Sequence, residues 1–195
     1  MRDTNNKIIN LPNAVSLLRL LLAPVLILLA IDQQPRWFIF IVLFSGFTDV
    51  LDGFLARTLH QITRLGSHLD SWGDFAIYSS MTIGAWLLWP EIVTRERIWI
   101  ILIIASFTLP VLLGLIKFHA LTSYHTWSVK LAVFCTFFSY ALLFSGIVTW
   151  PVYIAAAICV YAGIEEIAIT VLMQHERADI RSVWQALAYH RADQQ

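Results

Sequence analysis

Charged residues are scarce in this sequence of 195 residues, of which they make up 13%, compared with about a quarter of a typical soluble domain. The formal net charge is zero, so no basic excess indicates a nucleic-acid partner. Two cysteines, Cys135 and Cys159, lie inside apolar runs, which argues against a disulfide framework or a cysteine-based metal site. The polar N-terminus lacks a short apolar core with a small-residue cleavage site, so we expect no cleaved signal peptide.

Hydrophobic residues make up 58% of the chain, and the mean hydropathy is +0.70. They gather in six segments, each near the ~20 residues that a helix needs to cross the ~30 Å hydrocarbon core of a bilayer. The segments are 14–31, 37–55, 67–89, 98–116, 129–147 and 152–173. A membrane barrel would instead need shorter, alternating segments. The sequence therefore predicts an all-α integral membrane bundle of six transmembrane helices, forming one domain over residues 1–195.

The lysines and arginines of the loops predict an orientation. Nine of them fall on the side of the N-terminus and three on the other side. Because Lys and Arg concentrate in cytoplasmic loops, we expect both termini in the cytoplasm, at the inner membrane of a bacterium. Residues 3–13 and residues 175–187 would each form a short helix on the cytoplasmic surface. Four tryptophans would then form an aromatic belt at the outer interface: Trp37, Trp89, Trp99 and Trp150.

Four aspartates interrupt this apolar pattern within residues 49–74, DVLDGFLARTLHQITRLGSHLDSWGD. Asp49 and Asp52 are three residues apart, and Asp70 and Asp74 are four apart, so each pair shares one helix face. The connection between the two helices is short, which makes them neighbours. We therefore expect the four acids to face each other at similar depth, in the cytoplasmic half of the membrane.

Four facing carboxylates need positive charge nearby, because repulsion and desolvation disfavour their ionised forms. Two divalent cations would balance them, and an oxygen-only ligand set suits Mg²⁺ or Mn²⁺ better than zinc. Two such ions beside Arg57 would form a clamp for a diphosphate. Internal ion pairs of the acids with Arg57 and Arg64 are an alternative, and so is a cation-conducting site.

The stretch resembles the signature of the CDP-alcohol phosphatidyltransferase family, D-x2-D-G-x2-A-R-x8-G-x3-D-x3-D. Its positions are filled by Asp49, Asp52, Gly53, Ala56, Arg57, Gly66, Asp70 and Asp74. Residues 11–24, LPNAVSLLRLLLAP, are similar to the Pro-Asn stretch that opens many members. The resemblance implies a phospholipid-synthesising enzyme that transfers a phosphatidyl group from CDP-diacylglycerol to an alcohol and releases CMP. It also implies two bound Mg²⁺ or Mn²⁺ ions and a homodimer.

The resemblance implies a role for each matching position. Asp49, Asp52 and Asp70 would be metal ligands, whereas Asp74 would bind the second metal and act as general base on the acceptor hydroxyl. Six residues would contact CDP-diacylglycerol: Gly53, Ala56, Arg57, Thr63, Asn13 and Ser16.

The acceptor is less constrained. Lys117 and Lys130 lie at the ends of a polar cytoplasmic segment and could bind a phosphorylated acceptor, or could be ordinary lysines snorkelling at helix ends. For the two histidines between them, His119 and His125, we expect an ordinary role at the membrane interface. Lys130 alone matches the G-K-x-K-T run of the phosphatidylglycerophosphate synthase subgroup. Glycerol 3-phosphate is the single acceptor that we expect, with inositol phosphate or serine as alternatives.

Three further charged residues lie within apolar segments. Arg19 could face the site or snorkel toward the interface. Glu165 and Glu166 lie in the last segment, where we expect capping or pairing rather than catalysis.

Two other classes of membrane protein also use intramembrane acidic residues, but they fit this sequence less well. An intramembrane prenyltransferase would need two separate Asp-rich motifs, whereas this chain has one contiguous cluster. A cation transporter would need acids near the midplane on a path open to both sides, whereas these acids are off-centre.

Overall fold

The computed structural model describes residues 11–58, 64–118, 126–173 and 182–192, with side chains at 14–48, 72–118, 126–173 and 182–188. Every regular element in these ranges is a helix. The helices are α1 (Leu11–Ile31), α2 (Pro35–Thr58), α3 (Arg64–Leu88), α4 (Pro90–Arg95), α5 (Arg97–Phe118), α6 (Trp127–Phe144), α7 (Pro151–Leu172) and α8 (Val183–Ala192). The chain divides into two compact units, Met1–Val93 and Thr94–Gln195.

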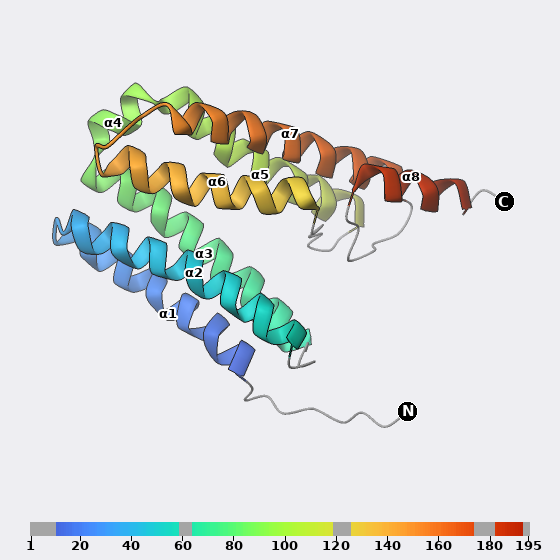
Figure 1. Cartoon of the computed structure of the whole chain (residues 1–195), viewed down its shortest axis with the longest axis horizontal. Coiled ribbons are helices and arrows are strands. Elements are labelled where there is room, and N and C mark those ends of the chain that lie inside the picture. Colours follow the sequence, from blue (N-terminus) through green and yellow to red (C-terminus); the bar gives the residue numbers. More distant parts are fainter. Residues whose placement is uncertain (1–10, 59–63, 119–125, 174–181, 193–195) are drawn as a thin grey trace. The chain divides into compact units, whose positions relative to one another are not determined.

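In the first unit, α1 lies side by side with both α2 and α3 (Figure 1). The buried face of α1 follows the three-and-four spacing of one helix stripe. Its members are Ser16, Arg19, Ala23, Leu26 and Ala30. Arg19, the only charged residue in α1, is therefore part of this buried face.

Phe38, near the beginning of α2, is a core residue of the first unit. Its side chain is fully buried, and its ring meets that of Trp89 edge to face with centroids 6.0 Å apart. A Cβ at Gly84 would lie 2.2 Å from this ring, so α3 can approach α2 here only because residue 84 has no side chain.

In the second unit, α7 packs against α5, α6 and α8. Ala132 on α6 and Cys159 and Ala162 on α7 form a buried cluster. The side chain of Thr126 caps α6 by accepting a hydrogen bond from the Val129 amide at 3.2 Å. The helix α8 docks through Ala186, which packs on Ile169 and Met173.

The structure confirms the all-helical fold class for the residues that it describes, and its long apolar helices fit an integral membrane protein. In its described part, four helical stretches are long and apolar enough to cross a bilayer. These are Ala14–Ile31, Arg97–Phe118, Trp127–Phe144 and Pro151–Leu172, and a shorter apolar helix covers Pro35–Thr48. The count of six spans, their orientation and the single-domain assignment stay predictions.

Several boundaries differ from those expected. The short helix α4 was not predicted, and α6 ends at Phe144 rather than near residue 147. At that end, Ser145 is the C-cap and Gly146 takes a left-handed φ of 75°, a conformation that terminates helices. The expected surface helix at residues 3–13 lies almost wholly outside the described residues. For the C-terminal one, the described residues show the helix α8 from Val183, and its position at the cytoplasmic surface stays a prediction.

Candidate active site

All eight positions of the signature lie on helical backbone. The helix α2 extends to Thr58 and carries the first five positions, and α3 begins at Arg64 and carries the last three. Each aspartate pair therefore shares a helix face, as the spacing predicts. Asp74 is the signature aspartate whose side chain is described, so the predicted metal ligands Asp49, Asp52 and Asp70 stay predictions. Among the described side chains, no group of three potential metal ligands occurs.

Asp74 forms an ion pair with Arg19 across the interface between α1 and α3. The Arg19 Nη1 donates to Asp74 Oδ1 at 2.5 Å. The arginine side chain is only 1% exposed, whereas that of the aspartate is 37% exposed. Arg19 is thus buried toward α3 instead of snorkelling to the membrane surface, and its partner is the aspartate expected to act as base.

Two small contacts bring α1 and α3 together around this pair. A Cβ at Gly73 would lie 3.4 Å from the Ser16 carbonyl oxygen and 3.5 Å from the Arg19 Cβ, so a single methyl group would fill the space between the helices here. Two turns along α3, the Ser80 hydroxyl donates to the Ala23 carbonyl oxygen at 3.2 Å. The Gly73 position lies directly beside the Arg19–Asp74 pair, whereas the Ser80 hydrogen bond is a separate attachment between the two helices.

The other predicted donor contacts are placed to different extents. Ser16 is buried on the same face of α1 as Arg19, beside Gly73. Asn13, Gly53, Ala56 and Arg57 lie on helical backbone, but their side chains are outside the described ones. Thr63 lies outside the described residues.

The two acceptor candidates have different surroundings in the second unit. The Lys117 ammonium donates to the carbonyl oxygens of Thr170, Val171 and Met173 at 2.9, 2.9 and 2.8 Å. It thereby caps the C-terminal end of α7, where carbonyls lack helical partners. Lys130 is exposed, with its ammonium 5.1 Å from the centre of the Trp127 ring.

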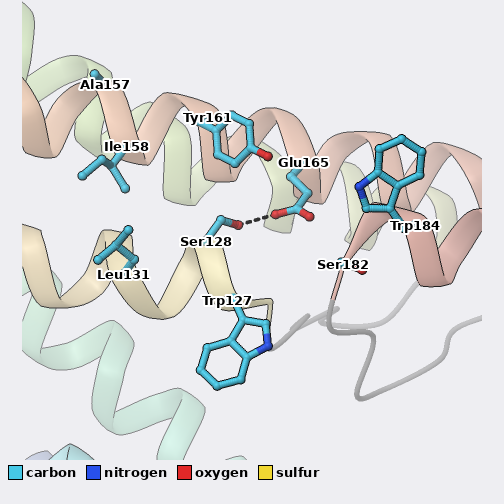
Figure 2. Close-up of a pocket in the computed structure, with 9 residues that line it drawn as sticks. All are labelled: Trp127, Ser128, Leu131, Ala157, Ile158, Tyr161, Glu165, Ser182 and Trp184. Carbon is cyan, nitrogen blue, oxygen red and sulfur yellow. Dashed lines mark hydrogen bonds between the residues drawn. The ribbon is translucent and has the colours of Figure 1, made fainter.

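Glu165 links the beginnings of α6 and α8. One carboxylate oxygen accepts from the Ser128 hydroxyl (Figure 2), and the other accepts from the Val183 amide at 3.1 Å. A carboxylate at a helix N-terminus satisfies an otherwise unbonded amide, which fits the predicted capping role.

Glu165 also lines a groove of about 580 Å³. Apolar and aromatic side chains form most of this groove: Trp127, Leu131, Ala157, Ile158, Tyr161 and Trp184.

The sequence matches one known protein family over most of its length. The model of the family described as CDP-alcohol phosphatidyltransferase matches residues 9–173. This range contains the whole of α1 through α7, and it includes the whole signature.

Curated relatives resemble parts of the chain. A CDP-diacylglycerol–glycerol-3-phosphate 3-phosphatidyltransferase of Aquifex aeolicus is 39% identical over 75 residues, or 37% of this chain and 42% of the relative. A cardiolipin synthase (CMP-forming) of Streptomyces coelicolor is 30% identical over 126 residues, or 60% of this chain and 56% of the relative. The chain thus spans about half the length of these relatives.

Proposed function

The chain belongs to the CDP-alcohol phosphatidyltransferase family, and we propose that it transfers a phosphatidyl group from CDP-diacylglycerol to an alcohol, releasing CMP. The observation that carries this proposal is the complete signature on α2 and α3. Its last aspartate, Asp74, meets a buried arginine at the α1–α3 interface. Such a transfer would be a step of phospholipid biosynthesis.

Divalent cations fit the residues present. The four signature acids are all carboxylates, which is the ligand type that Mg²⁺ and Mn²⁺ prefer. We propose that two such ions are held by Asp49, Asp52, Asp70 and Asp74. When bound, the ions would neutralise the charge of the diphosphate.

Asp74 is the proposed general base. An alcohol is a weak nucleophile at neutral pH, so a carboxylate within reach of the hydroxyl proton assists attack. The acceptor oxygen would form a bond to the phosphorus next to diacylglycerol, and the bond to the CMP phosphate would break. The proton from the hydroxyl would move to Asp74, which is partly exposed and so accessible to an acceptor.

The donor would lie along the signature. Gly53 and Ala56 are small and leave space on the face of α2 that carries Asp49, and Arg57 would bind the diphosphate. Asn13, Ser16 and Thr63 are the further proposed donor contacts. A lipid donor accounts for a polar site placed within an apolar helical protein.

The membrane setting is part of the proposal. The helices α2 and α3 have 24 and 25 residues, so at ~1.5 Å per residue each is long enough to cross a bilayer. We propose six spans, with the termini and the site at the cytoplasmic side of a bacterial inner membrane. A homodimer is also proposed, from the family resemblance.

Two acceptors are supported by the relatives. Glycerol 3-phosphate is the acceptor in the name of the Aquifex relative, and we propose it first. The Streptomyces relative matches over more residues and is named for cardiolipin. Forming cardiolipin with release of CMP would require phosphatidylglycerol as acceptor, which is the second candidate. Lys130 is the proposed acceptor contact, since Lys117 already donates to three carbonyls.

The test is an assay of CMP release by the purified protein. It would receive CDP-diacylglycerol with Mg²⁺ and, separately, glycerol 3-phosphate, phosphatidylglycerol, inositol phosphate or serine, and the lipid product would be identified by its mass. We expect CMP in equal amount to the new lipid with one acceptor. Absence of CMP with every acceptor would contradict the proposal and favour a cation transporter.

A further inference from the structure

We infer that Arg19 is a positioning residue for the transfer reaction, holding the Asp74 carboxylate in the orientation from which it accepts the proton of the alcohol. Arg19 lies in α1, outside the signature of residues 49–74. The inference rests on the proposed function, because that proposal makes Asp74 the base.

The geometry of the pair supports orientation of the carboxylate. The donor is one nitrogen of a planar guanidinium group, whose rigid fork restricts its partner more strongly than a lysine ammonium would. The contact is to Oδ1 of Asp74 at 2.5 Å. Because Arg19 is 1% exposed and Asp74 is 37% exposed, the buried cation approaches from the protein side and leaves the carboxylate accessible from the other.

The arginine itself has little freedom. Its Cβ lies 3.5 Å from the position that a Cβ of Gly73 would take, directly beside Asp74 in the chain. A single methyl group would therefore fill the space between the helices at this point, and the Arg19 side chain reaches Asp74 across this narrow gap. A carboxylate held this way loses few alternative orientations when substrate binds, which is the purpose of preorganisation.

Helix packing alone does not account for a charge at this position. An arginine in an apolar membrane helix is costly to insert, and a buried ion pair is weak evidence of a stability role. The two helices also have another attachment, the hydrogen bond from Ser80 to Ala23, and each of them buries apolar side chains, such as Leu26 in α1 and Ile77 in α3. The placement of a cation on the proposed base is better explained by the reaction.

The experiment compares three variants of the full-length protein, Arg19→Gln, Arg19→Lys and Ser80→Ala, in the CMP-release assay. Arg19→Gln should lower kcat by about 10- to 100-fold, the scale of loss expected when a reacting group is misplaced by ~1 Å. The KM for CDP-diacylglycerol should stay within about threefold. Arg19→Lys should restore part of kcat. Ser80→Ala removes a different link between α1 and α3 and should keep the wild-type kcat.

A double-mutant cycle with Asp74→Glu separates positioning from general loosening. If Arg19 acts through Asp74, Arg19→Gln should cost much less in the Asp74→Glu background than in the wild type. Independent, multiplicative losses would overturn the inference, and so would a wild-type kcat in Arg19→Gln. If Arg19→Gln fails to fold, a wild-type kcat in Arg19→Lys overturns the proposed role of the guanidinium group.

The outcome also distinguishes this inference from the proposed function. A wild-type protein that releases no CMP with any acceptor rejects the proposed function, and with it the role of Arg19. A wild-type protein that turns over normally, with an equally active Arg19→Gln variant, rejects the role of Arg19 alone. An equal fall of kcat in Ser80→Ala and Arg19→Gln would show that Arg19 acts through the packing of α1 against α3 and does not position Asp74, which overturns the inference.

Discussion

Gly163 in α7 touches the backbone of Ser106 in α5 so closely that a Cβ at residue 163 would lie 2.8 Å from the Ser106 carbonyl oxygen. Small residues at such crossings allow membrane helices to pack backbone against backbone. Gly163→Ala should therefore push α5 and α7 apart, at a cost of about 1–3 kcal/mol. A thermal melt in detergent should show a lower Tm, whereas Ile164→Ala, on the exposed face beside it, should leave the Tm nearly unchanged. An unchanged Tm in Gly163→Ala would contradict this close packing.

Lys117 should contribute to stability and not to acceptor binding. Lys117→Met leaves three carbonyls at the end of α7 without their donor, and we expect a loss of about 1–2 kcal/mol, since bonds to charged donors are individually worth about 1.5–3 kcal/mol and this lysine is partly solvated. The KM for the acceptor should not change. A raised KM for the acceptor without a lowered Tm would contradict this prediction and support Lys117 as an acceptor contact.

Lys130 should behave in the opposite way. Its ammonium is exposed and lies over the Trp127 ring, so little stability depends on it. We expect Lys130→Met to keep the Tm and to raise the KM for a phosphorylated acceptor about tenfold, since charge-assisted bonds to phosphate are the stronger class. Lys130→Arg should recover most of this loss. An unchanged KM would remove Lys130 from the proposed site.

Asp74→Asn should abolish transfer while binding of CDP-diacylglycerol and metal continues. Asparagine retains an oxygen that can accept from Arg19 but cannot take up the proton, and general-base assistance is worth about 10²–10⁴ in rate. Single-turnover CMP release would measure the loss, and a shift in Tm with added CDP-diacylglycerol would report binding. Asp32→Asn is the control, because Asp32 lies exposed in the turn between α1 and α2. Full activity in Asp74→Asn would show that another group is the base.

Removal of divalent cations should stop the reaction. Titration with EDTA should bring CMP release to background, and Mg²⁺ or Mn²⁺ should restore it, because the donor set is entirely carboxylate. A parallel thermal melt would show whether the protein remains folded. CMP release that persists in excess EDTA would contradict the two-ion site.

Hydropathy was sufficient to predict the long helices, because an apolar run of membrane-spanning length has few other conformations available in lipid. It could not predict the end of α6, which depends on a left-handed turn at Gly146, or the short helix α4. Both are local features without a hydrophobic signal of their own.

The signature predicted which residues share a face of α2 and which share a face of α3, since their spacing is a property of consecutive sequence, whereas the meeting of the two faces stays a prediction. The partner of Asp74 was not predictable in this way, because Arg19 comes from a helix 55 residues away in the chain. A signal was nevertheless present: Arg19 is the one charged residue of α1, three positions after Ser16. The contact of Lys117 with α7 likewise depends on how α5 and α7 pack, which spacing does not reveal.

The ion pair between Arg19 and Asp74 also bears on how the protein is made. During synthesis α1 reaches the membrane well before residue 74 leaves the ribosome, so its arginine enters without the carboxylate that later neutralises it. The remaining apolar residues of α1 must offset that cost alone. The carboxylate of Asp74 arrives only with α3, so the charge of Arg19 is neutralised after the two helices have come together.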